Sequence, residues 1–402
     1  MKQFIYLSIL SLLTGLQAFA QATVVTMTTT NDSVFIRIEW TGAGSIAVNG
    51  MEVKTPHTIE NTIFPVIDGS VAITATGDAQ LTLLHCYQNS LLTLELTNCT
   101  ELTTMWCDEN FLTALDVTKC LKLTELSCSR NVLSALDVTN CTKLTSLDCT
   151  YNTLVALDVA NCPELTALDC YYNSLTSLDV ANCPKLTDLW CHRNLLTALD
   201  ITKSLLLKTL WCGYNSLSAL DVANCTELTW LECDNNSLST LDVANCPKLT
   251  TLSCSNNSLF ALDITKCPEL VELKCNNSSL STLDITNCFE LKELYCANNS
   301  LSGLDITNCT VLSELSANGQ TLILPATAPR RTKLRIKNPV TFAGAEVKIE
   351  NVSHNGTYKD GNIAWAVSGE SGELTFDFAA ELPGDLVGIP FSGTVTQPWI
   401  KK

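Results

Sequence analysis

The sequence has 402 residues, of which 46% are apolar and 16% charged, and its formal net charge at pH 7 is -17. This composition excludes a disordered chain, because enough apolar surface is present to build a core. The negative charge argues against nucleic acid or an anionic membrane as partner, since both require a basic surface. Cationic or neutral partners fit better.

The first 20 residues have the pattern of a secretory signal peptide. Lys2 precedes an apolar stretch at residues 4–16, and Ala18-Phe19-Ala20 forms a small-x-small cleavage site. No later apolar run approaches the ~20 residues of a membrane span, and no lipid-bearing cysteine or wall-sorting tail is recognised. We therefore expect a signal peptide at residues 1–20 and an exported chain, secreted or at the cell surface, without direct membrane insertion.

Residues 21–80 alternate between apolar and polar side chains, as in the stretches 33–40 and 70–75, with glycines marking turns. This pattern predicts a β-rich N-terminal cap. The end of a repeat stack needs such a cap, because it would otherwise expose core leucines and an unpaired strand edge.

Leucine recurs every 21 residues, twelve times from Leu81 to Leu312. With this leucine as position 1, the unit reads LxxLxCxxNxLxxLDVxxCxx. Two clusters with a period of two, such as Leu147 with Cys149 and Leu157 with Val159, predict two short parallel strands per unit. One unit cannot bury its own leucines, so the units must stack. We expect a mainly β solenoid over residues 81–319, with eleven full coils and one degenerate coil.

Residues 320–402 lose this period and contain strand-like segments divided by turns at 360–361, 369–372 and 383–384. They predict a small, β-sandwich-like C-terminal domain, for which an immunoglobulin-like form is the open alternative.

All 21 cysteines fall at position 6 or position 19 of the unit, and Ser204 is the one gap. Cysteines on neighbouring parallel strands are about 4.8 Å apart with parallel Cβ directions, whereas a disulfide needs converging Cβ atoms ~3.8 Å apart. We expect reduced thiols packed as small hydrophobic groups, with disulfides between the two columns as the open alternative. No C-x-x-C pair is present, and no metal site is expected.

Two polar columns are predicted to serve the backbone. Asparagine occupies position 9 in ten of the eleven full repeats, with Ser278 as the exception, and its amide can bond its own turn and the adjacent coil. Position 15 carries Glu95 and then ten aspartates, which we expect to accept backbone N–H groups of the following turn. A calcium-binding ladder is the alternative for these carboxylates.

Positions 3, 5, 7 and 8 are predicted to point outward from the first strand of each coil. Four of the seven tryptophans and six of the eight tyrosines lie at these positions, although core packing does not require them there. Exposed aromatic residues beside carboxylates are typical of protein interfaces and of sugar-binding surfaces. The alternative is that the aromatic pairs only stabilise the sheet. The predicted partner-binding residues are Trp106, Asp148, Tyr151, Asp169, Tyr171, Tyr172, Trp190, His192, Arg193, Trp211, Tyr214, Trp230, Glu232 and Asp234.

From Leu81 to about Leu315 the unit resembles the cysteine-containing 21-residue repeats of internalin J-like bacterial leucine-rich-repeat proteins. The resemblance implies a right-handed leucine-rich-repeat solenoid and a role in extracellular recognition or adhesion, with a host or cell-surface protein, glycoprotein or glycan as ligand. No catalytic or cofactor site is expected, because the four histidines are scattered and no catalytic motif is present.

Two other functions remain open. One is a structural envelope or extracellular-matrix protein. The other is a carbohydrate-active solenoid that would use Asp148, Asp169 or Glu232 as acid and base.

Overall fold

The computed structural model describes residues 22–53, 57–324, 333–337, 340–342, 347–353, 355–359, 361–366, 371–380, 387–389 and 391–400. Every regular element in these ranges is a β-strand. The signal peptide predicted at residues 1–20 lies outside them. Within the described ranges, no helix has the length and apolar character needed to cross a membrane.

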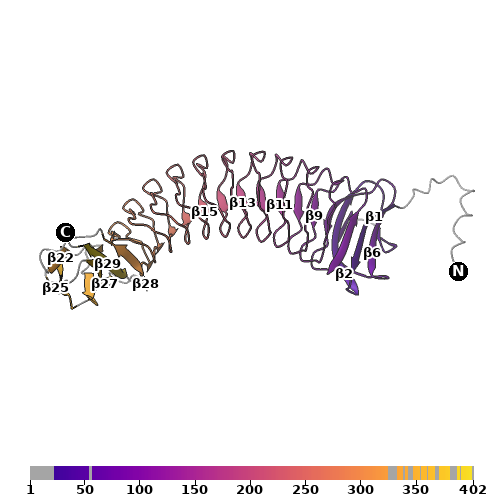
Figure 1. Ribbon diagram of the computed structural model, residues 1–402. Helices are drawn as coiled ribbons and strands as arrows, with labels where there is room; N and C mark the ends of the chain where they lie inside the picture. The colour runs from indigo at the N-terminus through magenta and orange to yellow at the C-terminus, as the bar shows by residue number, and fades with distance from the viewer. Residues whose placement is uncertain are drawn as a thin grey trace, which may run out of the picture.

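The 21-residue units form coils that stack side by side in a curved row (Figure 1). Each coil contributes one short strand, and neighbouring strands pair in parallel with the same register throughout, so that Leu147 pairs with Leu168. This confirms the predicted leucine-rich-repeat solenoid. The strands are β9 (Thr104–Trp106), β10 (Glu125–Ser127), β11 (Ser146–Asp148), β12 (Ala167–Asp169), β13 (Asp188–Trp190), β14 (Thr209–Trp211), β15 (Trp230–Glu232), β16 (Thr251–Ser253), β17 (Glu272–Lys274), β18 (Glu293–Tyr295) and β20 (Glu314–Ser316).

The second predicted strand of each coil is shorter than expected. At position 15 the described coils show isolated parallel bridges, such as Asp116 with Asp137 and Asp179 with Asp200. Longer pairing occurs only near the ends, in β8 (Leu91–Leu96) and β19 (Gly303–Leu304). The cause is local, because the position-15 carboxylate accepts the backbone N–H two residues later and turns the chain, as Asp137 Oδ1 does from Thr139 N at 3.0 Å. The predicted backbone role is confirmed for the ten aspartates of this column, whereas Glu95 makes no such hydrogen bond among the described residues.

The core is one continuous cluster in which the leucines of positions 1, 4, 11 and 14, the valine or isoleucine of position 16 and both cysteine columns are buried. All 21 cysteines lie in the described residues and are free, in agreement with the predicted reduced ladder. Burial raises the pKa of the Cys191 thiol to about 12, so the thiol stays protonated at neutral pH.

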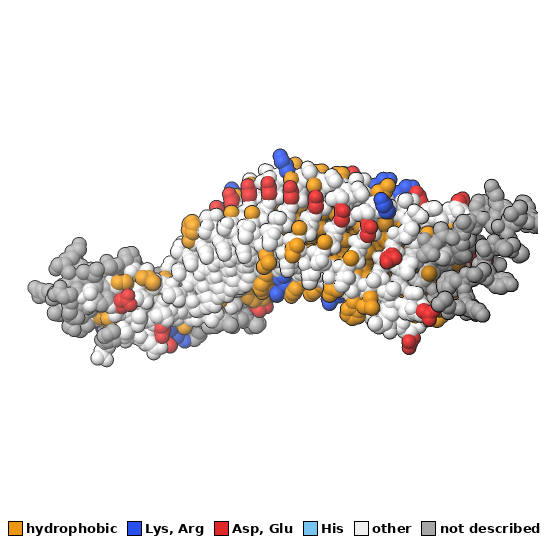
Figure 2. Space-filling view, turned by 45° about the vertical axis from the view of Figure 1, so that its right-hand side comes forward, with side chains coloured by type: hydrophobic (Ala, Val, Ile, Leu, Met, Phe, Trp, Pro, Cys, Tyr) orange, Lys and Arg blue, Asp and Glu red, His pale blue; other side chains and the backbone are white. Residues whose placement is uncertain are grey.

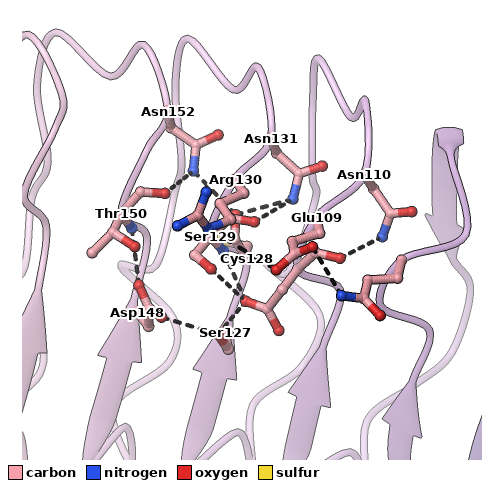
Figure 3. A network of polar contacts seen from close by, with 12 residues as sticks. Glu109, Asn110, Ser127, Cys128, Ser129, Arg130, Asn131, Asp148, Thr150 and Asn152 are labelled. Atoms are coloured by element: carbon pink, nitrogen blue, oxygen red, sulfur yellow. Dashed lines mark hydrogen bonds and ion pairs between the residues drawn. The ribbon is translucent and has the colours of Figure 1, made fainter.

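The position-9 asparagines link adjacent coils as predicted. Asn131 Nδ2 donates to Cys128 O at 3.1 Å in its own coil (Figure 3). It also donates to Cys107 O at 3.0 Å in the preceding coil, while its Oδ1 accepts from Leu112 N at 3.0 Å. Gln320 makes the same contacts in the degenerate coil, with its Oε1 accepting from Leu301 N. At Ser278 the shorter side chain leaves its buried Oγ without a partner among the described residues.

The N-terminal strands pair with both edges of the first coil. β2 (Ser33–Thr41) pairs antiparallel with β7 (Gln80–His85), which pairs in parallel with β9, and β5 (Thr58–Pro65) forms the outer edge of this 15-stranded sheet. A second sheet contains β1 (Ala22–Thr29), β3 (Ile46–Val48), β4 (Met51–Val53), β6 (Ser70–Ala75) and β8. Asn89 joins the first coil to the N-terminal strands, because its side chain exchanges two hydrogen bonds with the backbone of Phe35 in β2.

At the other end, β28 (Val387–Ile389) pairs in parallel with β20 and completes the long sheet. β21 (Gln320–Ile323) pairs in parallel with β29 (Ser392–Ile400). β29 pairs antiparallel with β27 (Ser371–Ala380), and β27 pairs antiparallel with β24 (Val347–Glu350). β22 (Lys333–Lys337), β26 (Asn362–Ala366) and β25 (Thr357–Lys359) form a three-stranded sheet, and β23 (Thr341–Phe342) pairs with β19. Buried Phe342, Trp365 and Phe376 fill the interior of this region.

Candidate binding surface

We call the outward side chains at positions 3, 5, 7 and 8 of the coils the strand face. At position 5, the parallel register makes Trp190 and Trp211 Cα partners, and their rings stack with centroids 4.8 Å apart and planes 11° apart. Trp230, at position 3 of the next strand, lies 5.5 Å from Trp211 between centroids. Its Nε1 donates to Glu232 Oε1 at 2.9 Å. The three indoles therefore form the strip that the sequence predicts.

Positions 7 and 8 extend this strip sideways. The ring of Tyr171 stacks on His192 at 4.4 Å, and Tyr151 stacks on Tyr172 at 4.4 Å. Two further contacts reach the indoles, from Tyr171 to Trp190 at 6.4 Å and from His192 to Trp211 at 5.7 Å. We call the resulting set the aromatic array: Tyr151, Tyr171, Tyr172, Trp190, His192, Trp211 and Trp230.

Position 8 carries two arginines and three tyrosines in five successive coils along the edge of the aromatic array: Arg130, Tyr151, Tyr172, Arg193 and Tyr214. The Arg130 guanidinium lies 4.4 Å from the centroid of the Tyr151 ring, and that of Arg193 lies 4.8 Å from Tyr172 and 4.1 Å from Tyr214. Distances of this size give favourable cation–π attraction.

Every one of these residues has left-handed backbone geometry, with φ between 50° and 54°. Four later coils place asparagine in the same position and conformation, which asparagine tolerates well. Arginine and tyrosine there cost about 1 kcal/mol more per residue in backbone strain. The turn geometry therefore does not favour arginine or tyrosine at this position. The four asparagines are Asn235, Asn256, Asn277 and Asn298.

Carboxylates flank the aromatic array on both sides. Burial, and next the charges of Asp148 and Asp188, raise the pKa of Asp169 to about 7. Burial also raises the pKa of Asp148, Glu232 and Asp234. The strand face thus holds partly buried acids whose negative charge is poorly compensated.

The aromatic array also carries unpaired nitrogen atoms. Burial, and then the charge of Arg193, lower the pKa of His192 to about 4, so its imidazole is neutral at physiological pH. His192 Nδ1, Trp190 Nε1 and Trp211 Nε1 are buried atoms without a hydrogen-bond partner in the described part of the chain. A bound ligand or ordered water can satisfy them.

Trp106 is the predicted residue that the structure keeps apart from the aromatic array. Its ring stacks on His85 with a centroid distance of 4.1 Å and an angle of 2°. Ser127, Asp148 and Asp169 separate it from Trp190 in the position-5 column. His85, Asp108 and Arg130 also belong to this surface but were not among the predicted partner-binding residues, although Arg130 shares its column with Arg193. Among the described residues, no three histidine, cysteine, aspartate or glutamate side chains gather in a metal-binding arrangement.

Acidic side chains are arranged regularly along the solenoid. Figure 2 shows a regular row of acidic side chains along one edge of the solenoid. Such a row agrees with the exposed aspartates of position 15, one in each coil from Asp116 to Asp305.

The 21-residue coil, the asparagine ladder and the two columns of buried cysteines define a leucine-rich-repeat solenoid with a cysteine ladder. InlJ from Listeria monocytogenes, whose functional domain includes a cysteine ladder, superposes with a TM-score of 0.56 at 28% identity, over 79% of this chain and 90% of that one. The chain is therefore internalin J-like in its repeats.

Two further solved structures share the fold. An internalin, InlF, from Listeria monocytogenes has a TM-score of 0.55 at 20% identity, over 60% of this chain and 75% of that one. A leucine-rich-repeat protein from Leptospira interrogans has a TM-score of 0.54 at 23% identity, over 60% of this chain and 66% of that one.

Sequence comparison points the same way for parts of the chain. Internalin I of Listeria monocytogenes is 34% identical over 89 residues, which are 21% of this chain and 5% of that much longer protein. Residues 344–400 match the LRR-adjacent family, which places that similarity directly after the repeats. The likeness to InlJ in the repeats, together with the LRR-adjacent match, shows an internalin-like solenoid followed by an LRR-adjacent segment.

Proposed function

We propose that this chain is a secreted or cell-surface bacterial recognition protein, not an enzyme, that binds a host or cell-surface protein or glycoprotein through its strand face. The observation that carries the proposal is the aromatic array. It is a contiguous, partly exposed set of rings on a sheet that is open to solvent, and Trp230 and Tyr172 keep 39% and 37% of their surface exposed. Large aromatic side chains of this kind dominate the energetics of protein interfaces.

Sheet stability alone does not account for the aromatic array. β10 and β16 carry serine at position 5 and keep the same parallel register as β13 and β14. The coils that place asparagine at position 8 fold in the same way and avoid the strain borne by Tyr172 and Arg193. The aromatic and cationic residues thus bring a local free-energy cost that binding can offset.

The test is a binding screen against host proteins, mucin-type glycoproteins and glycans, with a hydrolysis assay on each ligand. Saturable binding without turnover is expected. The variant Trp190→Ala/Trp211→Ala/Trp230→Ala should lose this binding and still unfold cooperatively. Phe260→Ala is the matched control, because Phe260 is 59% exposed and lies outside the strand face; it should bind as the native chain does.

Each other outcome contradicts the proposal in its own way. Unchanged binding by the triple variant would place the site elsewhere. Turnover of a glycan would favour the carbohydrate-active solenoid, with Asp148, Asp169 or Glu232 as the acid and base. Absence of both binding and turnover would favour a structural envelope or matrix protein.

A further inference from the structure

A pocket of about 320 Å³ lies on the strand face between β9 and β11, apart from the aromatic array. Trp106 forms one wall, Ser127 lies in the middle, and the carboxylates of Asp108, Glu125 and Asp148 surround it. Its volume is at the lower end of the range for ligand sites, roughly 300–1,000 Å³, and suits a single side chain.

The pocket exists because the position-5 column changes size here. One face of the Trp106 indole is covered by the stacked His85 ring, 4.1 Å away. The next residue in the column is Ser127, which is too small to cover the other face, and Trp106 remains 40% exposed. By contrast, Trp190 is covered by Trp211. The pocket therefore offers an uncovered aromatic surface.

Two of the carboxylates are fixed in position by hydrogen bonds. Asp108 Oδ1 accepts from Ser127 Oγ and from Ser129 N and Oγ at 3.0 Å. Asp148 Oδ1 accepts from Thr150 N at 3.0 Å, and Asp148 Oδ2 lies 3.4 Å from Ser127 Oγ (Figure 3). Asp108 Oδ2 accepts no hydrogen bond from the described residues, so it is available to a ligand.

The same hydrogen bonding of one aspartate by two serine residues recurs six coils further on, and we call it the second copy. Asp234 Oδ1 accepts from Ser253 Oγ at 2.6 Å and from Ser255 N at 2.8 Å, as Asp108 does from Ser127 and Ser129. In the second copy the next residue of the position-5 column is Lys274. The lysine charge acts on both Asp234 and Glu232, and its ammonium group pairs with Glu272. The second copy therefore contains a cation of its own, which partly offsets its negative charge.

The first copy lacks such a cation. Asp148 stands where the second copy has Lys274. The guanidinium of Arg130, in the same coil as Ser127, is engaged by the Tyr151 ring at 4.4 Å and by Glu109 at 4.0 Å. Burial, followed by the charge of Arg37, lowers the pKa of His85, which keeps this ring neutral at physiological pH. The pocket thus combines an open indole with three carboxylates and no positive charge among its lining residues.

We propose that this pocket receives the guanidinium group of an arginine side chain presented by the protein ligand, an inference that rests on the proposed recognition function. A planar guanidinium stacks on an indole and donates several hydrogen bonds in its own plane, which matches Trp106 beside Asp108 and Asp148. It supplies from outside the positive charge that Lys274 supplies within the second copy. Carboxylates also accept hydrogen bonds from sugar hydroxyls, and the test separates the two ligands.

The probe is N-acetyl-arginine amide, titrated into ¹⁵N-labelled full-length protein while the indole N–H signals are followed by NMR. Trp106→Phe assigns the signal of Trp106. We expect a saturable shift of this signal, with a dissociation constant of about 1–10 mM, as is usual for a fragment this small. N-acetyl-citrulline amide, which has nearly the same shape without the charge, should bind at least about tenfold more weakly.

Three variants define the site. Asp108→Asn/Asp148→Asn should weaken arginine binding by about tenfold or more, whereas Asp234→Asn, the matching change in the second copy, should leave it unchanged. Asp148→Lys rebuilds the internal cation of the second copy and should abolish binding. Thermal unfolding of each variant checks that the solenoid remains folded.

The proposal is overturned if the Trp106 signal does not move, if citrulline binds as well as arginine, or if simple glycosides shift the signal and arginine does not. Failure of this inference can be told apart from failure of the proposed function, because the triple tryptophan variant that tests the function leaves Trp106 unchanged. Loss of ligand binding in the triple tryptophan variant with no arginine effect at Trp106 would leave the function standing and remove only this pocket.

Discussion

The indole rings of Trp190 and Trp211 stack with their centroids 4.8 Å apart and their planes inclined by 11°. Their spacing follows from the parallel pairing of β13 and β14, which places successive position-5 residues about 4.8 Å apart. Two indoles held in this way couple electronically, so the stack has a spectroscopic signature of its own.

The first prediction concerns this stack. Trp211→Ala should abolish an exciton couplet in the circular dichroism spectrum and lower the free energy of unfolding by about 1–2 kcal/mol, because contacts to Trp190, His192 and Trp230 are lost. Trp106→Ala is the control and should preserve the couplet, since Trp106 stacks on His85. Equal loss of the couplet in both variants would contradict the structure.

The second prediction concerns the gap in the asparagine ladder. Ser278→Asn should raise the free energy of unfolding by about 1 kcal/mol, because the amide supplies hydrogen bonds that the unpaired serine does not. Asn257→Ser is the converse change. It removes donations to Cys233 O and Cys254 O and the acceptor of Leu238 N, and should cost about 2 kcal/mol. Urea unfolding measures both, and a destabilising Ser278→Asn would show that the site has no room for the amide.

The third prediction concerns alkaline pH. The thiol pKa rises from 9.0 to about 12 at Cys191 and to about 11 at Cys225, because of burial. The stability contributed by neutral thiols is therefore fully present below about pH 9 and is lost as the pH rises from there through the folded values. Each fully buried thiol contributes a slope of up to about 1.4 kcal/mol per pH unit, so unfolding should become steeply favourable above pH 9.

The control for this prediction is Cys225→Ser/Cys246→Ser, which copies Ser204 from the same column. It should reduce the slope of stability against pH between 9 and 10, measured by denaturant unfolding in the presence of reductant. An unchanged slope would mean that groups other than the thiols drive alkaline unfolding.

The fourth prediction concerns Asp169. Its pKa is raised from 3.8 to about 7. The stability contributed by the neutral Asp169 carboxyl is therefore fully present below about pH 4 and is lost as the pH rises through 7. Asp169→Asn should therefore stabilise the protein relative to the native chain at pH 8, by about 1–2 kcal/mol after screening by solvent, and have little effect at pH 5.

Asp200→Asn provides the opposite sign. Hydrogen bonds from Thr202 lower the pKa of Asp200, so its contribution is present above about pH 4 and is lost only as the pH falls further. This variant should show no change in pH dependence between 5 and 8. A native chain whose stability does not fall relative to Asp169→Asn between these values would contradict the raised pKa.

The strict period made much of this architecture predictable. With a constant 21-residue unit, each column of the sequence becomes a column in space, so the buried thiols, the role of Asn131 and the contact of Trp190 with Trp211 all follow from residue types and spacing. The second strand was overestimated, because the aspartate of position 15 turns the chain after a single bridge.

Other features depend on backbone angles and side-chain rotamers that periodicity does not specify. The left-handed geometry at Tyr172 was signalled only indirectly, by the asparagines that replace it in later coils. The pocket beside Trp106 depends on how Ser127, Asp108 and Asp148 orient one another, which no single column reveals. Gln320 occupies position 9 of the degenerate coil, where the sequence indicated a loss of the pattern, although its longer amide makes the same hydrogen bonds as the asparagines.

The ladder of hydrogen bonds described for Asn131 reaches only the coil before it, and this locality has an evolutionary consequence. A whole coil can be duplicated or deleted without altering any contact inside the others. Duplication of the coil that holds both Asp148 and Tyr151 would separate the Trp106 pocket from the aromatic array by one strand spacing. The distance between the two proposed recognition elements is thus heritable, set by the number of coils and independent of the chemistry of either element.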